Sequence, residues 1–367
     1  MADKEEDNLE VVDEENGDVN DYWKKQVEQV FYPFVRKSPS WSIYEIVKTT
    51  LMTVFVFPIR VVLIFFFAIL TYLVAKVALL GEDEERPVPY STWKKFLLRS
   101  ISPLIRAALF CCLGVYYIEQ TKREDERPAY VIVSNHTGYI DILILCAMYR
   151  GGFVAKGSVK NARLVGTIAR ALQCLFVVEG ASLTETLKAR IVSTYECHLK
   201  KGCIGCPTCF RNIVIFPEGT TTNGYGMVPM RTGVFVAGLP VKPVAVRFPH
   251  RHFNLSWETI YLKEHIWRSM TQFRNYAELV ECPTYVPTEE DIQNPREFAR
   301  HVQESLNEVL DLPVYPIGRK HKFAYHKYVL GLRTAEEVLQ DGKELTKKDE
   351  LLVEVTKRQA AAGKLCP

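Results

Sequence analysis

The sequence has little net charge, and its first residues lack the features of a signal peptide. Among 367 residues, 46 Lys and Arg stand against 43 Asp and Glu, which gives a formal net charge of +3. A chain so close to neutral gives no sign of a basic surface for a polyanion, so we expect no nucleic-acid partner. Residues 1–20 are acidic, where a signal peptide would be basic and then apolar. We therefore expect the ten cysteines to be reduced thiols that face the cytosol.

The first twenty residues also have few large apolar side chains. They carry nine carboxylates against one lysine. A segment with so much charge of one sign and so little apolar surface cannot bury enough to fold. We predict that residues 1–20 are a disordered acidic arm, and that the rest of the chain holds one large domain with appendages or two modest domains.

The longest apolar stretch, residues 51–80, has too short an uncharged part to cross a bilayer alone. Residues 61–75 are uncharged and number 15, whereas a spanning helix needs about 20. Including residues 51–59 gives enough length, but Pro58 can then kink the helix and Arg60 must find a partner. A straight span and a bent or re-entrant helix both remain open, and basic residues on both sides leave the topology undecided.

A second apolar stretch, residues 97–118, carries Arg99 and Arg106. We expect an amphipathic segment at the membrane interface, with an ordinary packed helix as the equal alternative. Upstream aromatic residues are interpreted as further interface anchors; they are Trp23, Phe31, Tyr32 and Phe34.

From about residue 129, short β-rich runs alternate with helical segments. This alternation predicts an α/β fold with a mixed, largely parallel sheet flanked by helices. The expected strands are 129–134, 152–156, 174–178, 212–216 and 242–248, and the expected helices between them are 141–149, 161–171 and 183–200. Helical spacing of apolar residues in 296–311 predicts a surface helix that closes the domain.

A histidine and an aspartate stand five residues apart in "SNHTGYID", residues 134–141, directly after an apolar run. Residues five apart on one helix lie about 140° apart around its axis, so His136 and Asp141 can meet only if a helix begins between them. We predict that a strand ends at Ser134, that Gly138 eases the turn, and that Asp141 lies in the first helical turn. Its carboxylate would then accept from one ring nitrogen and leave the other as a base.

No nucleophilic serine accompanies this pair. The sequence lacks the Gly-x-Ser-x-Gly elbow of lipid hydrolases, which counts against an enzyme that uses water as its acceptor. A His–Asp pair without its serine suits an enzyme whose substrate supplies the hydroxyl.

Four sequence blocks occur in an order and spacing that resemble the glycerophospholipid acyltransferase superfamily. They are "NHTGYID", "GGFVAKGSVKNARLVG", "FPEGTTTNG" and "VKPVAV", and the resemblance runs from about residue 97 to 312. The sequence is most similar to the lysophosphatidylcholine and lysophosphatidylethanolamine acyltransferase branch. The resemblance implies an acyltransferase domain at 119–312. The apolar stretches predict membrane-anchoring hydrophobic helices at 21–118, and residues 333–367, which are charged and weakly periodic, indicate a peripheral, charged C-terminal tail at 313–367.

The resemblance implies roles for individual residues. His136 would deprotonate the free glycerol hydroxyl, which attacks the thioester of acyl-CoA, and Asp141 would orient the imidazole. The remaining expected site residues would shape the pocket for the lysolipid and bind its phosphate; they are Lys156, Glu218, Gly219, Thr220 and Thr221. Lys160 and Arg163 are alternatives to Lys156. Acyl-CoA is expected as a co-substrate, with no cofactor and no metal.

Thr221 bears on the choice of acceptor. The branch that makes phosphatidic acid usually has arginine here, a fork suited to a bare phosphate monoester. We therefore expect transfer to the sn-2 hydroxyl of lysophosphatidylcholine or lysophosphatidylethanolamine in phospholipid remodelling, on the cytosolic face of the endoplasmic reticulum. The alternatives are a 1-acylglycerol-3-phosphate or glycerol-3-phosphate acyltransferase and, more distantly, an inactive lipid-sensing module that binds membrane lipid.

A cysteine cluster has the spacing of zinc ligands. Cys203, Cys206 and Cys209 are separated by two residues each, and Cys197 or His198 would have to complete a site of four ligands. We favour reduced thiols in a loop, because the family chemistry needs no metal.

Overall fold

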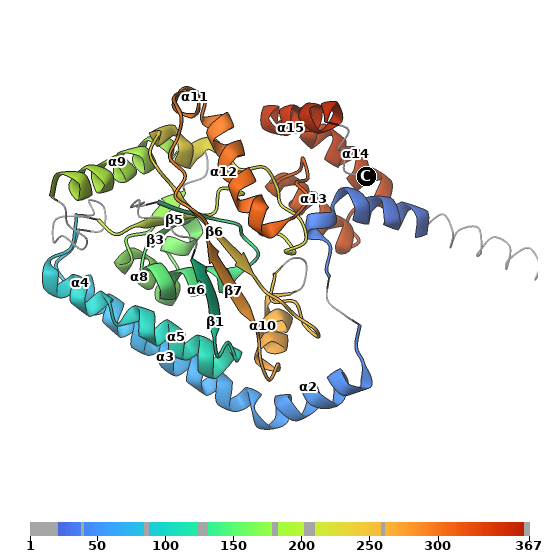
Figure 1. Ribbon diagram of the computed structural model, residues 1–367. Coiled ribbons are helices and arrows are strands. Elements are labelled where there is room, and N and C mark those ends of the chain that lie inside the picture. The colour runs from blue at the N-terminus through green and yellow to red at the C-terminus, as the bar shows by residue number, and fades with distance from the viewer. Residues whose placement is uncertain are drawn as a thin grey trace, which may run out of the picture.

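A computed structural model describes residues 21–37, 40–83, 88–122, 131–177, 183–201, 210–257 and 261–362. The predicted acidic arm, residues 1–20, lies outside these residues. Within them, one seven-stranded sheet has the strand order β1-β7-β6-β2-β5-β3-β4. Neighbouring strands are parallel except for β6 and β7, which are antiparallel. The predicted α/β class with a largely parallel sheet is confirmed (Figure 1).

All five predicted strands are present, and two further strands were not predicted. The bounds are β1 Ile118–Lys122, β2 Val131–Ser134, β3 Gly152–Lys156, β4 Leu175–Val177, β5 Ile213–Ile215, β6 Lys242–Arg247 and β7 Ala277–Glu281. Strands β1 (IEQTK) and β7 (AELVE) carry charged residues, whereas the central strands β2 (VIVS) and β5 (IVI) carry none. Strands buried on both faces give long apolar runs, and these two lack that signature.

Two helical layers cover the two faces of the sheet. Successive side chains of a strand point to opposite faces, so neighbouring residues of one strand belong to different cores. Ile132 belongs to the core shared with the layer of α3, α5, α6 and α8. Val131 and Val133 belong to the core on the opposite face, shared with α9 and α12. The bounds are α6 Tyr139–Tyr149, α7 Gly157–Lys160, α8 Arg163–Ala171, α9 Thr184–Lys201, η2 Thr232–Ala237, α10 Leu262–Met270, α11 Glu289–Gln293 and α12 Pro295–Leu310.

The apolar stretch at 51–80 forms a bend and no single straight helix. Helix α2 (Ile43–Phe55) ends before Val56, and α3 (Phe57–Ala78) begins with Pro58 in its first turn. The buried Arg60 finds its partners in α10 and the loop after it, where its Nη1 lies 2.7 Å from the carbonyl oxygens of both Met270 and Gln272. The bend between α2 and α3 is visible beneath the sheet in Figure 1.

Two segments are long and apolar enough to cross a membrane, judged by length and composition. They are Phe57–Ala78, which is α3, and Thr92–Leu113, which contains α4 (Thr92–Leu98) and α5 (Ile101–Leu113). Helices α3 and α5 lie side by side (Figure 1). One side of α5 is buried in the core that also contains Ile132 of β2, so this stretch is a packed helix with one exposed side.

The N-terminal aromatic residues are packed against the end of the chain. Phe31 and Phe34 are fully buried, and Phe31 stacks on Tyr325 with ring centroids 5.7 Å apart. Tyr32, in the short helix η1 (Tyr32–Phe34), stacks on Tyr315. The prediction of membrane-interface anchors is therefore wrong for Phe31 and Phe34, because rings buried within the protein are not available to lipid.

The expected C-terminal tail is folded. Helices α13 (Arg319–Val329), α14 (Ala335–Lys347) and α15 (Glu350–Ala361) each contribute buried residues, among them Tyr325, Val338 and Leu352. Their weak apolar periodicity suggested a peripheral segment, but the missing apolar surface comes from residues 27–35 at the other end of the chain. Figure 1 shows these helices beside the N-terminal helical segment, residues 21–30.

Candidate active site

The predicted His–Asp pair forms at the end of β2. The strand ends at Ser134, α6 begins at Tyr139, and Asp141 lies in its first turn. His136 Nδ1 is 2.9 Å from Asp141 Oδ2, and the side chain of Asp141 is fully buried while that of His136 is 17% exposed. The prediction that a helix begins between the two residues is confirmed. The paired carboxylate lies in the interior, and the imidazole reaches the surface.

The Asp141 carboxylate is fixed by the backbone of the turn. Its Oδ2 accepts from the backbone N–H groups of Thr137 at 2.6 Å and Gly138 at 3.0 Å, and its Oδ1 accepts from the Thr137 hydroxyl at 3.1 Å. Acidic groups are stabilised at a helix N-terminus by these otherwise unpaired N–H groups and by the helix dipole. An acceptor oxygen fixed at Nδ1 favours the tautomer with the proton on Nδ1, so Nε2 of His136 is the basic nitrogen.

Gly138 allows a second chain segment to approach the turn closely. A Cβ atom there would lie 3.2 Å from the backbone nitrogen of Trp257. The Trp257 N–H donates to the Thr137 carbonyl at 2.7 Å. The turn is therefore held from outside as well as from within.

Asn135 continues the pairing of β2 with β6 into the turn. Its side-chain amide donates to the carbonyl of Val246 at 2.9 Å, and its side-chain oxygen accepts from the N–H of Val246 at 2.8 Å. These two bonds resemble those of a strand pair and set the direction of the chain just before His136. Sequence reasoning missed this residue, although its place beside the histidine in the first block was a signal.

Glu218 braces the turn from the next strand, β5. Its Oε1 accepts from the His136 N–H at 2.9 Å, and its Oε2 accepts from the Val228 N–H at 3.1 Å. Burial raises the pKa of this carboxyl to about 8, although the two N–H donors oppose the shift. Both oxygens contact the backbone, so the geometry places Glu218 as a support of the histidine turn.

The segment after β5 wraps around His136. The Phe216 ring stacks on the imidazole with centroids 4.0 Å apart, and the Thr222 N–H donates to the His136 carbonyl at 2.9 Å. Between them, Gly219 has a φ of +67°, and a Cβ there would meet no atom within 4 Å. The backbone at Gly219 therefore borders open space beside the histidine turn, while Thr220 is mostly buried.

Thr221 and Lys156 both lie beside α13. The Thr221 hydroxyl donates to the Trp257 carbonyl at 3.2 Å and accepts from Nζ of Lys322 at 2.5 Å. Lys156, at the end of β3, is exposed, with its Nζ 6.0 Å from the centroid of the Phe323 ring. The structure thus brings Thr221, Glu218 and Gly219 to the His136 turn. No direct contact of Lys156 with His136 is seen among the described residues, and the alternatives Lys160 and Arg163 are exposed.

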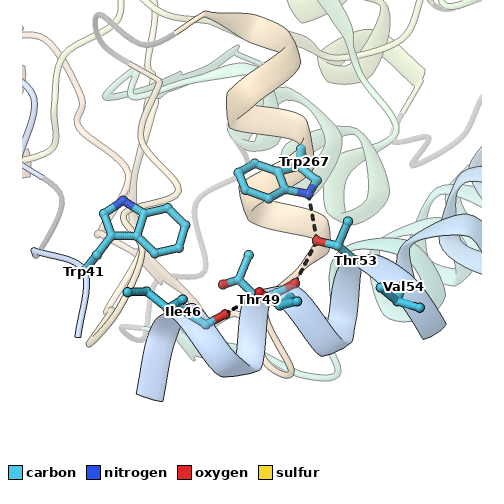
Figure 2. Close-up of a pocket in the computed structure, with 7 residues that line it drawn as sticks. Trp41, Ile46, Thr49, Thr53, Val54 and Trp267 are labelled. Carbon is cyan, nitrogen blue, oxygen red and sulfur yellow. Dashed lines mark hydrogen bonds between the residues drawn. The ribbon is translucent and has the colours of Figure 1, made fainter. Parts of the chain in front are cut away.

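A hollow of about 230 Å³ lies elsewhere, between α2 and α10. Figure 2 shows Trp41 and Trp267 on two sides of it, with the Trp267 indole N–H donating to the Thr53 hydroxyl at 2.9 Å. The other lining residues are Ile46, Thr49, Thr50 and Val54. None of the predicted site residues lines this hollow, so it is separate from the His–Asp pair.

The described part of the chain contains no cluster of three or more His, Cys, Asp or Glu side chains suited to a metal. Cys203, Cys206 and Cys209, the proposed zinc ligands, lie outside the described residues. Cys197 is disulfide-bonded, and the expectation of reduced thiols is wrong for this residue. The free cysteines among the described residues are Cys111, Cys112, Cys146, Cys174 and Cys282.

Comparison with known proteins identifies relatives over the same region. Residues 115–247 match the family model described as Acyltransferase. The "Lysophospholipid acyltransferase LPEAT1" of Arabidopsis thaliana is 35% identical over 219 residues, 58% of this chain and 52% of that protein. "Lysophospholipid acyltransferase LPEAT2" of the same plant is 31% identical over 298 residues, 80% of this chain and 52% of that protein. "Lysophosphatidylcholine acyltransferase 1" of Danio rerio is 27% identical over 340 residues, 84% of this chain and 62% of that protein.

The chain spans about half the length of the first two relatives. The matched region contains the β2–α6 turn with its His–Asp pair and the β5 segment that wraps around it. Over residues 115–247 the chain therefore matches the acyltransferase family, and the relatives it is similar to are named lysophospholipid and lysophosphatidylcholine acyltransferases.

Proposed function

We propose that this protein is an acyl-CoA-dependent lysophospholipid acyltransferase. It transfers a fatty acyl chain to the free sn-2 hydroxyl of lysophosphatidylcholine or lysophosphatidylethanolamine. The observation that carries the proposal is the buried Asp141 carboxylate, 2.9 Å from Nδ1 of the partly exposed His136. Relatives at 35% and 31% identity that are named lysophospholipid acyltransferases support the reaction class.

The reaction follows from the pair without a protein nucleophile. Nε2 of His136 takes the proton of the acceptor's hydroxyl as its oxygen attacks the thioester carbonyl of acyl-CoA. The tetrahedral intermediate collapses with loss of the coenzyme A thiolate, which takes up the proton from His136. The ester is formed, the thioester is broken, and the histidine returns to its starting state. Asp141 stabilises the imidazolium between the two proton transfers.

The membrane helices support a position at a bilayer, where the lysolipid resides. Two segments are long and apolar enough to cross a membrane, and most of the outward side of α3 is exposed. We propose the endoplasmic reticulum membrane with a cytosolic catalytic face, because acyl-CoA is cytosolic. Selective permeabilisation of cells followed by protease treatment tests this orientation.

The test of the activity is an acyl-CoA transfer assay on purified protein in vesicles with a panel of lysolipid acceptors. We expect transfer to lysophosphatidylcholine or lysophosphatidylethanolamine in preference to lysophosphatidic acid. His136→Ala and Asp141→Asn should each lower kcat by about 10²-fold or more, because general-base catalysis contributes on that scale.

A matched control comes from a second His–Asp pair in the chain. His301 Nδ1 is 2.7 Å from Asp291 Oδ1 on the α11–α12 side of the fold. His301→Ala removes a histidine from a similar pair outside the site, so we expect its activity to stay near that of the wild type. Equal activity of His136→Ala and the wild type would refute the general-base assignment, and faster acylation of lysophosphatidic acid would refute the acceptor assignment.

A further inference from the structure

We propose that Lys322, which α13 brings to Thr221, supplies the positive charge that binds the phosphate of the acceptor. This inference rests on the proposed function and deepens it, since it names the group that recognises the acceptor's charge. Lys322 lies outside the region matched by the family model, residues 115–247. It also lies in the segment whose sequence suggested a peripheral tail.

The ammonium group is placed directly at the motif residue. Lys322 Nζ lies 2.5 Å from the Thr221 hydroxyl and 2.9 Å from the Thr221 carbonyl oxygen. Lys322 is only 6% exposed. A charge in such surroundings acts through a lower dielectric than bulk water, so its pull on a nearby anion is stronger than that of a surface lysine.

Thr221 is tied to the histidine turn along two short paths. The next residue, Thr222, donates its N–H to the His136 carbonyl at 2.9 Å. The Thr221 hydroxyl donates to the carbonyl of Trp257, whose own N–H donates to the Thr137 carbonyl. The Lys322 ammonium group, which is hydrogen-bonded to Thr221, is therefore held in a fixed position relative to His136, the proposed base.

Helix α13 is itself held in place. His321, the neighbour of Lys322, has its Nε2 3.1 Å from the carbonyl of Gly342 and 3.0 Å from the Thr346 hydroxyl, both on α14. Phe31 packs on Tyr325 from the N-terminal side. Lys322 thus projects from a packed helix, and the position of its charge is determined by tertiary structure.

The next residue of α13 contacts the other predicted phosphate ligand. Nζ of Lys156 lies 6.0 Å from the ring centroid of Phe323, a distance at which an ammonium is attracted to an aromatic face. The ammonium group of Lys156, from β3, therefore lies beside the residue of α13 that follows Lys322. We include both charges in the proposed recognition of an anionic head group.

The chemistry of an ammonium group fits a phosphodiester. An arginine fork binds two oxygens of a phosphate monoester at once, whereas lysine acts as a compact point charge. A lysophospholipid with a capped head group carries one negative charge on its phosphate. A point charge at Thr221 suits that charge and leaves the amine-bearing part of the head group free to extend outward.

The test compares Lys322→Met with Lys320→Met in the vesicle assay. Methionine keeps the length of the side chain and removes its charge, and Lys320 is an exposed lysine of the same helix. We expect Lys322→Met to raise KM for lysophosphatidylcholine about 10-fold or more, with less change in kcat and in KM for acyl-CoA. Lys320→Met should behave as the wild type. An unchanged KM for the acceptor, or an equal rise in KM for both substrates, overturns the proposal.

A binding measurement separates this inference from the proposed reaction. Fluorescent lysophosphatidylcholine is titrated onto His136→Ala protein with and without Lys322→Met, so that no turnover is needed. A larger dissociation constant for the double variant than for His136→Ala alone supports the inference. Equal dissociation constants for the two proteins overturn it. If the wild-type protein transfers no acyl chain in the vesicle assay, the proposed function is refuted. The binding measurement needs no transfer, so its result does not depend on that outcome.

Lys322→Arg provides the comparison if Lys322→Met does not fold. Arginine keeps the charge but presents a bidentate fork, so we expect the ratio of KM values to shift in favour of lysophosphatidic acid over lysophosphatidylcholine. A ratio equal to that of the wild type overturns the assignment of phosphate binding to this side chain.

Discussion

Hydrogen bonds to the backbone fix the positions of the carboxyl groups of Asp141 and Glu218 in the site. Asp141 accepts from the N–H groups of Thr137 and Gly138, and Glu218 accepts from those of His136 and Val228. Each carboxyl group therefore pairs with backbone N–H groups of the turn or of the segment beside it. A buried N–H left without an acceptor costs about 1–3 kcal/mol, so both side chains also stabilise the fold.

The buried Glu218 predicts a pH dependence of stability. Its pKa is about 8 in the folded protein because of burial, against 4.5 for the ordinary value. Between these values the native state holds a proton that the unfolded chain has lost, so this contribution is complete below about pH 4.5 and falls as pH rises towards 8. The slope approaches about 1.4 kcal/mol per pH unit for one proton.

Denaturant unfolding of wild type and Glu218→Gln in detergent from pH 5 to 8 measures this dependence. We expect the wild type to lose stability relative to the variant as pH rises. In the variant, the NH₂ group of the glutamine faces one of the two backbone N–H groups, so two donors meet. This lowers the stability of the variant by an amount that does not depend on pH. Glu336→Gln, at an exposed position of α14, is the control. Parallel curves for wild type and Glu218→Gln would contradict a raised pKa.

At the scale of elements, α3 is fastened to the globular part by one arginine. Arg60 bonds to the carbonyls of Met270 and Gln272, at the end of α10 and in the loop that follows it. Gly114, which ends α5, lies close to the same guanidinium, since a Cβ there would be 3.3 Å from Nη2 of Arg60. A buried charged group with carbonyl acceptors is costly to disrupt, because its partners lose their hydrogen bonds.

We expect Arg60→Met to loosen α3 and to lower stability by about 2–4 kcal/mol, since two buried carbonyls lose a charged donor. The melting temperature in detergent and the rate of proteolysis between α2 and α3 report this change. Lys76→Met, at an exposed position near the end of the same helix, serves as the control. An unchanged melting temperature for Arg60→Met would show that the clamp contributes little.

At the scale of the molecule, apolar side chains gather on the outward side of α3. The α3 residues that are at least half exposed are Ile59, Val62, Phe65, Phe66, Ile69 and Leu73. Helix α2 adds further exposed apolar residues next to them along the chain, Leu51, Val54 and Phe55. A contiguous surface of this kind is typical of a membrane-facing side.

Replacing Val62, Phe66 and Ile69 together by asparagine should weaken vesicle binding. Burying a large apolar side chain contributes about 1.5–3 kcal/mol, so the three changes should lower the fraction that floats with liposomes in a density gradient. Val329, Leu330 and Leu332 are also exposed and lie by the end of α13; their triple asparagine variant is the control. Equal flotation of the two variants would contradict the assignment of α3 as the membrane-facing element.

Sequence reasoning predicted the central strands and the His–Asp pair because local patterns specify both. Apolar runs of strand length identify buried parallel strands, and the spacing of His136 and Asp141 requires a helix start at the turn. It failed for β1 and β7, whose charges hide them, and for the helices after residue 313, whose apolar partners are Phe31 and Phe34.

The sequence by itself determined the fold class and the His–Asp pair, because each depends on residues close together in the chain. It left a straight and a bent helix at 51–80 both open, and the structure decided for the bend between α2 and α3. Tertiary structure alone decided what surrounds the pair. Glu218 reaches His136 across 82 residues, and Lys322 reaches Thr221 across 101. Such contacts follow from the order of strands in the sheet and from the packing of both chain ends against each other, and no local pattern encodes either.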